Sequence, residues 1–167
     1  SIPSYYAEFK KVNGSIDIID AITDKEITKV LQQAAKNNLE YNSETVTILP
    51  IDFVIDDCNI VKDPKGLTGR KLEVRGIMVT TPKKNIISVV SLIESLGIEV
   101  VDISLNCIGD INAFKTKNMN EQTGALVNIG HETTNISLYK KGIVVKNVVL
   151  GLGGKNIDND IIYIYKI

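Results

Sequence analysis

The chain has 167 residues, of which 44% are hydrophobic, so it is long enough for one domain or two small ones with a real core. Its formal net charge is −1, and its basic residues are scattered, which argues against a nucleic-acid-binding face. Cys58 and Cys107 lie far apart with no Cys or His at ligand spacing, so we expect reduced thiols and no zinc site. No apolar run reaches the roughly 18–20 residues that cross a bilayer.

The first segment predicts a strand pair and a helix. Residues 5–19 alternate loosely around Gly14, which predicts two strands joined by a glycine turn. Thr23 and Glu26 form a capping box, with the acidic residue three positions after the N-cap. The helix that follows carries apolar residues at helical spacing and should end near two asparagines at 37–38.

Two strands should complete this first module. Residues 44–57 and 70–82 are rich in β-branched residues, and Pro50 predicts an edge or a bulge. Residues 63–69 (DPKGLTG) form a loop of turn-favouring residues between them. The pair Asp56-Asp57 looks like a metal site, but consecutive strand residues point to opposite faces, so we expect solvated charges at a strand end.

The spacing of apolar residues changes after Pro82, from a strand pattern to a helical one. Residues 83–96 predict an amphipathic helix closed by Gly97. A short buried strand is expected over 98–106, and a second, shorter helix over 107–116.

The polar run 115–124 is the best linker candidate in the chain. Three strands in meander order should follow at 125–130, 133–140 and 143–149, and a glycine-rich turn then leads into a helix. The chain begins without methionine and stops inside an apolar helical pattern, so we expect a piece of a longer protein.

Five separated segments resemble the bacterial cell-division protein FtsA family of the actin and sugar-kinase superfamily. These segments, in chain order, are SIPSYY, TVTILPIDFVID, DPKGLTGRKLEV, VNIGHETTNISLYKKG and LGGKNIDNDI. The pilus-assembly protein PilM shares the superfamily hairpin, and its resemblance to the second and third segments is weaker.

The resemblance implies an α/β fold with an inserted strand-helix-strand-strand subdomain and a partial actin-like (ribonuclease H-like) core. The inserted subdomain would occupy residues 1–80, the end of the first actin-like core 81–118, and the start of the second core 119–167. The first phosphate loop would lie before this sequence. Three further parts would lie after it: the adenine pocket, the surface that binds FtsZ and a membrane-targeting helix.

The hairpin at 127–139 resembles the second phosphate-binding hairpin of that superfamily. Backbone N–H groups there face phosphates, and carboxylates orient Mg²⁺ or water. Here Asn128 and Asn135 stand where aspartates are usual, and His131 and Glu132 replace two glycines. The amides carry no charge, so we expect weaker Mg²⁺ binding, and the two larger side chains would crowd a phosphate.

The resemblance implies a set of phosphate-contacting residues, in the intact protein only: Asn128, Gly130, Thr133, Thr134, Gly153 and Gly154. The glycine pair precedes a helix whose N-terminal N–H groups attract anions. Asp158 and Asp160 would instead interact with the helix dipole in its first turn. His131 has no serine, cysteine or carboxylate placed to form a triad, so we expect no catalytic residue and no metal ligand.

The resemblance implies a cytoplasmic scaffold at the inner face of the membrane at the division site, which polymerises and links the FtsZ ring to the membrane. Its partners would be further copies of itself and other division proteins, with no nucleic acid. We expect this chain to have no cofactor and no ATPase activity, although ATP with Mg²⁺ could bind the longer protein. The alternatives are a PilM-like pilus-assembly adaptor and a kinase or chaperone ATPase of the same superfamily.

Overall fold

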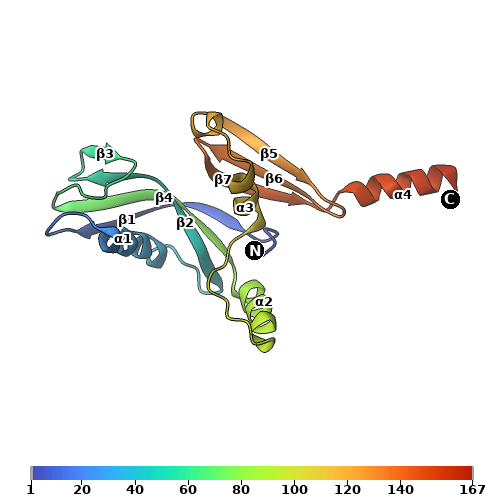
Figure 1. The fold of residues 1–167 in the computed structure, drawn as a ribbon, viewed down its shortest axis with the longest axis horizontal. Coiled ribbons are helices and arrows are strands. Elements are labelled where there is room, and N and C mark those ends of the chain that lie inside the picture. The colour runs from blue at the N-terminus through green and yellow to red at the C-terminus, as the bar shows by residue number, and fades with distance from the viewer. Residues whose placement is uncertain (1, 167) are drawn as a thin grey trace. The chain divides into compact units, whose positions relative to one another are not determined.

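The structure is a computed structural model that describes residues 2–166 (Figure 1). Its contacts divide the chain into two compact units, one of residues 8–101 and one of residues 2–7 with 102–166. Each unit contains its own sheet. The assignment of 81–118 and 119–167 to two actin-like cores stays a prediction.

The unit of residues 8–101 is built on a four-stranded antiparallel sheet in the order β1-β4-β2-β3. Its elements are β1 (Glu8–Asp17), α1 (Asp24–Lys36), β2 (Ser43–Ile55), β3 (Asn59–Val61), β4 (Lys71–Pro82) and α2 (Lys83–Ser95). The predicted strand-helix-strand-strand order is therefore present, with the short β3 as an addition. A hairpin partner of only three residues is too short to show in a sequence pattern.

The helix α1 begins where its capping box predicts. Thr23 is the N-cap, and its backbone N–H donates to the Glu26 carboxylate at 3.1 Å. Val30 and Ala34 are fully buried and pack into one core cluster with Val74 of the central strand β4. The amphipathic helix thus covers one face of the sheet.

The predicted strand pair around Gly14 is wrong, because β1 is one continuous strand. All ten of its residues pair with β4, and Gly14 lies opposite Val74. A Cβ on Gly14 would lie 2.6 Å from the Ala34 nitrogen and 2.7 Å from the Val30 oxygen. This glycine allows α1 to approach the strand closely and makes no turn.

The strand β2 carries the irregularity that Pro50 predicts, since its register with β4 shifts between Pro50 and Asp52. Asp56 and Asp57 are exposed directly after the end of β2, as predicted, and they form the tight turn to β3 with positive φ at both residues. The Asp56 carboxylate accepts the backbone N–H groups of Arg70 and Lys71 at 2.8 and 2.9 Å. These two bonds lower the pKa of Asp56 and fasten the turn to the start of β4.

The helix α2 follows β4 directly and ends before Gly97, whose φ of +76° fits the predicted glycine stop. The strand predicted over 98–106 does not form. Only Leu105 makes an isolated parallel bridge, to Ile2. A strand needs a paired neighbour, and the described part of the chain offers this segment only the residues around Ile2.

The second unit contains a three-stranded antiparallel sheet in the order β5-β6-β7. Its elements are α3 (Asn106–Phe114), the 3₁₀ turn η1 (Asn118–Asn120), β5 (Thr123–Ile129), β6 (Thr134–Lys140), β7 (Ile143–Leu150) and α4 (Gly154–Tyr165). The helix α3 contacts all three strands and buries Cys107 and Ile111. The predicted linker is partly structured, because η1 buries Met119.

Candidate functional site

The hairpin that the sequence singles out joins β5 to β6. Asn128 and Asn135 are direct cross-strand partners, so the two amides that replace the usual aspartates lie side by side on one face. The Gly130 N–H donates to the Thr133 carbonyl at 2.8 Å. That bond closes the turn and occupies an N–H group that a phosphate would need.

A carboxylate from another element reaches these two amides. Asp110 on α3 accepts hydrogen bonds at the same oxygen, Oδ2, from Asn128 Nδ2 at 3.1 Å and from Asn135 Nδ2 at 3.4 Å. Sequence reasoning missed Asp110, because a lone acidic residue in a short helix has no distinguishing pattern. The two asparagines in place of the usual aspartates gave no indication of which element would supply a carboxylate.

The asparagines and Asp110 line a small pocket of about 130 Å³ within this unit. Asn135 Oδ1 is itself buried and accepts no hydrogen bond from the described residues. Ten residues line the pocket: Pro3, Ser4, Tyr5, Asn106, Asp110, Asn128, Gly130, Thr133, Asn135 and Val149. Three of the predicted phosphate-contacting residues are therefore brought together here with a carboxylate.

The other three predicted residues lie at the junction of the hairpin with α4. The Gly154 N–H donates to the Gly130 carbonyl at 2.9 Å, and the Lys155 N–H donates to the His131 carbonyl at 2.8 Å. Thr134 Oγ1 donates to the Leu152 carbonyl at 2.7 Å. The N-terminal N–H groups of α4 that the sequence offered to an anion are thus bonded to the chain itself.

The space around residue 153 at this junction admits only a glycine. A Cβ there would lie 2.5 Å from the carbonyl oxygens of both Gly130 and His131. Asp158 and Asp160, predicted in the first turn of the helix, lie beyond it, because α4 begins at Gly154 and its first turn contains no acidic residue.

The two large residues at the hairpin tip are exposed. The Glu132 carboxylate pairs with Lys155 Nζ at 2.8 Å, which lowers the pKa of Glu132 and raises that of Lys155. Glu132 is thereby tied to α4. His131 has no hydrogen-bonded serine, cysteine or carboxylate in the described part of the chain, so the geometry forms no triad around it.

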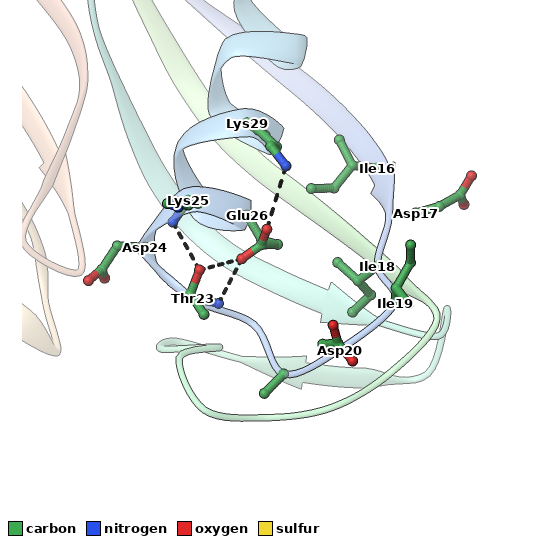
Figure 2. Close-up of a pocket in the computed structure, with 11 residues that line it drawn as sticks. Ile16, Asp17, Ile18, Ile19, Asp20, Thr23, Asp24, Lys25, Glu26 and Lys29 are labelled. Atoms are coloured by element: carbon green, nitrogen blue, oxygen red, sulfur yellow. Dashed lines mark hydrogen bonds and ion pairs between the residues drawn. The ribbon is translucent and has the colours of Figure 1, made fainter.

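A larger hollow of about 690 Å³ lies in the other unit, between the end of β1 and the start of α1. Figure 2 shows Ile16, Ile18 and Ile19 on one side and the first turn of α1 on the other. Glu26 is held by Thr23 and by Lys29 at 3.6 Å, and the bonds from Thr23 lower its pKa. The hollow is lined mainly by aliphatic and charged residues, which suits a protein contact.

Residues 2–166 contain no group of three or more His, Cys, Asp or Glu that could hold a metal ion. Within the same range, no helix has the length and hydropathy that a membrane span requires.

Comparison with protein families assigns part of the chain. Residues 6–80 match the family model described as the SHS2 domain inserted in FtsA. The matched range contains β1, α1, β2, β3 and most of β4, so it corresponds to the sheet of the first unit.

The chain as a whole is similar to curated FtsA proteins. It is 28% identical to cell division protein FtsA of Bacillus subtilis over 159 residues, covering 93% of the chain and 36% of that protein. The Streptococcus pneumoniae FtsA is 21% identical over 99% of the chain and 37% of its own length. The Buchnera aphidicola FtsA is 27% identical over 100% of the chain and 40% of its own length. The chain therefore spans little more than a third of the relatives it matches.

Among solved structures, a chain of the PilM-PilN type IV pilus biogenesis complex shares the fold. Its TM-score is 0.57 at 12% identity, over 97% of this chain and 44% of that one. The predicted α/β class with an inserted subdomain and a partial actin-like core is thereby confirmed. The chain is thus similar to the SHS2 domain inserted in FtsA over residues 6–80, and to curated FtsA cell-division proteins over most of its length.

Proposed function

We propose that this chain is part of an actin-related cell-division scaffold that polymerises and links the FtsZ ring to the membrane. The observation that carries the proposal is the match of residues 6–80 to the SHS2 domain inserted in FtsA, within a longer similarity to FtsA proteins. In this proposal, the unit of residues 8–101, called the SHS2 unit below, is the part that contacts other proteins. The whole protein works at the cytoplasmic face of the membrane at the division site.

The SHS2 unit has the properties of a contact surface. Ile19 lines the hollow, and 95% of its surface is accessible to solvent. Asp17 and Asp20 lie beside it, and neither joins an ion pair among the described residues. Exposed aliphatic residues beside unpaired charges fit the mixed character of non-obligate interfaces.

Charge reversal on the SHS2 unit tests the scaffold role. Arg70 is exposed and free of ion pairs among the described residues, whereas Lys65 pairs with Asp24 at 2.7 Å. Arg70→Glu is therefore the cleaner variant, with Lys65→Glu as a second and the exposed Lys117→Glu, which lies outside the sheet of the other unit, as control. In the full-length protein, we expect Arg70→Glu to reduce polymer pelleting and disturb division. Normal assembly in both SHS2 variants would contradict the contact role.

We also propose that this chain neither hydrolyses ATP nor binds it with useful affinity, although ATP with Mg²⁺ could bind the longer protein. Three features support this: the uncharged amides of Asn128 and Asn135, the bonded N–H groups of Gly130 and α4, and the Asp110 carboxylate beside the hairpin. Phosphoryl transfer depends on positioning and charge stabilisation, which these features do not provide. Calorimetry with Mg-ATP would overturn the proposal if it gave a micromolar dissociation constant.

The PilM-like adaptor is the second candidate, and the shared fold with the PilM-PilN complex favours it. The identity of 12% to that structure is lower than the 28% to Bacillus subtilis FtsA. Co-purification of the full-length protein with FtsZ or with a PilN-like partner separates the two.

A further inference from the structure

The outer side of β1 is an unpaired sheet edge. In the order β1-β4-β2-β3, β1 has β4 on one side and, among residues 2–166, no strand on the other. The Ile18 N–H donates to the Arg70 carbonyl at 2.8 Å, on the side of β4. Because backbone groups alternate in direction along an antiparallel strand, the N–H and C=O groups of Ser15 and Asp17 point to the open side.

The end of this edge lacks a common form of protection. Edge strands often carry lysines, which oppose pairing with a further strand. The strand β1 has Lys10 and Lys11 near its start, whereas residues 15–20 (SIDIID) contain no basic residue. Aliphatic and acidic side chains alternate there instead, so the edge is open to a strand of suitable charge.

Two carboxylates at this end of β1 select that charge. Asp17 and Asp20 join no ion pair among the described residues. Lys71 lies directly across from Asp17 on β4, but its Nζ pairs with Asp57 at 2.8 Å. Four acidic and two basic residues line the adjoining hollow. Opposite charges on neighbouring strands attract, so lysine or arginine would suit an added strand best.

The hollow of about 690 Å³ offers room for side chains of such a strand. Figure 2 shows Ile16 and Ile18 opposite Glu26 and Lys29 of α1, with the hollow lined by both elements. Its volume corresponds to roughly twenty waters at about 30 Å³ each. Strand residues alternate between the two faces of a sheet, so a residue added beside Ile16 would enter the hollow, and its chain neighbours would lie on the face of Asp17.

We propose that an extended basic segment of a partner protein adds to the edge of β1 at residues 15–17, with an apolar side chain in the hollow and lysine or arginine beside Asp17. Strand addition of this kind takes its affinity from main-chain hydrogen bonds and its selectivity from side-chain pockets. An acidic segment or an anionic lipid surface would meet carboxylates of like charge. The inference rests on the proposed contact role of the SHS2 unit and names the chemistry of its partner.

A designed peptide tests this edge on the whole chain. The probe is a capped peptide in which valine alternates with lysine, and its counterpart has glutamate in place of lysine. The lysine peptide should slow hydrogen exchange at the amides of Ser15 and Asp17, because their N–H groups become hydrogen-bonded. The glutamate peptide should bind about tenfold more weakly, because like charges placed side by side oppose association.

A charge exchange on the protein tests the selectivity. Asp17→Lys combined with Asp20→Lys alters two exposed residues and should reverse the preference, so that the glutamate peptide binds more tightly. Glu44→Lys combined with Glu94→Lys is the matched control. It makes the same change in net charge at two exposed residues outside the hollow, so the preference for the lysine peptide should remain.

Four results would overturn the proposal. They are no binding of the lysine peptide at about 1 mM, equal affinity for the two peptides, unchanged exchange at Ser15 and Asp17 in the bound state, and protection of these amides without peptide as the chain concentration rises. The last result would assign the edge to a second copy of the chain. Loss of polymer in Arg70→Glu alongside any of them would leave the scaffold role standing and remove only the role of the β1 edge.

Discussion

Asp56 shows how one carboxylate can hold a turn. Its pKa is lowered from an ordinary value of 3.8, first by the bond from the Arg70 N–H and then by the bond from Lys71. A lowered folded-state pKa gives stability that is present above the unfolded pKa and is lost as the pH falls through the folded value.

We predict that the stability difference between wild type and Asp56→Asn is full at pH 7 and shrinks as the pH falls below about 4. Asparagine tolerates the positive φ of this position and can accept one of the bonds, but it carries no charge. Urea unfolding at several pH values measures the difference. Asp57→Asn is the control, because its pair with Lys71 is exposed and contributes little. A difference independent of pH would contradict the prediction.

Asn128 permits a second prediction at this scale. Asn128→Asp would place a second carboxylate about 3.1 Å from Asp110. Like charges at about 4 Å repel by roughly 1–4 kcal/mol between water and a protein surface, so the variant should unfold at a lower temperature. Mg²⁺ should restore more stability to it than to wild type.

The double variant Asn128→Asp with Asp110→Asn is the matched control, since it exchanges the carboxylate and the amide. It should unfold near the wild-type temperature without added metal. Equal melting temperatures for Asn128→Asp and wild type in a chelator would show that the two side chains do not interact as described.

At the scale of elements, glycines allow two backbones to approach closely, and this positions α1 on β1 and α4 against the hairpin. Gly14→Ala would bring a Cβ within 2.7 Å of Val30 and Ala34 on α1. Overpacking of this kind costs about 1–3 kcal/mol, and the neighbouring atoms are helix backbone that cannot move alone. Chemical denaturation should report that loss, whereas exposed Gln32→Ala on the same helix should change stability by less than about 0.5 kcal/mol.

The junction between the hairpin and α4 gives the second element-scale prediction. Gly153→Ala should separate α4 from the hairpin, because its Cβ would meet two carbonyl oxygens at 2.5 Å. Hydrogen exchange at Gly154 and Lys155, whose N–H groups bond those carbonyls, should accelerate. Gly154→Ala is the control, since its Cβ would meet only Gly130 O at 3.8 Å. Equal exchange in the two variants would contradict the role assigned to Gly153.

At the scale of the whole molecule, a broad apolar surface is exposed. The face of the β5-β6-β7 sheet opposite Asn128 leaves Val127 52%, Ile129 69% and Val148 41% accessible. The helix α4 has no buried residue and continues from this sheet in Figure 1. Contiguous apolar surface of this kind favours association.

We predict that the chain self-associates through this sheet face. Val127→Lys with Ile129→Lys should shift the light-scattering mass toward that of a monomer, because the charges disrupt a surface that needs an apolar partner. Val101→Lys is the control, at an apolar residue that is 89% exposed outside the sheet. A clean monomer for the wild type at high concentration would contradict the prediction.

The sequence by itself determined the features that depend on near neighbours in the chain. The capping box of α1, the stop at Gly97 and the meander β5-β6-β7 were predicted correctly, because caps, turns and periodicity are local. The five-segment resemblance to FtsA agrees with the similarity that the comparisons find, since the order of motifs along a chain is itself information in the sequence.

Only the tertiary structure decided what depends on distant segments meeting. Gly14 was interpreted as a turn because a glycine within an alternating segment looks the same whether it bends the chain or admits a helix. Residues 98–104 have the composition of a strand but lack a paired neighbour. Asp110 reaches Asn128 and Asn135 across 18 and 25 positions of sequence. No local sequence pattern predicts the charge beside the hairpin, because it is the packing of α3 on the sheet that brings Asp110 there.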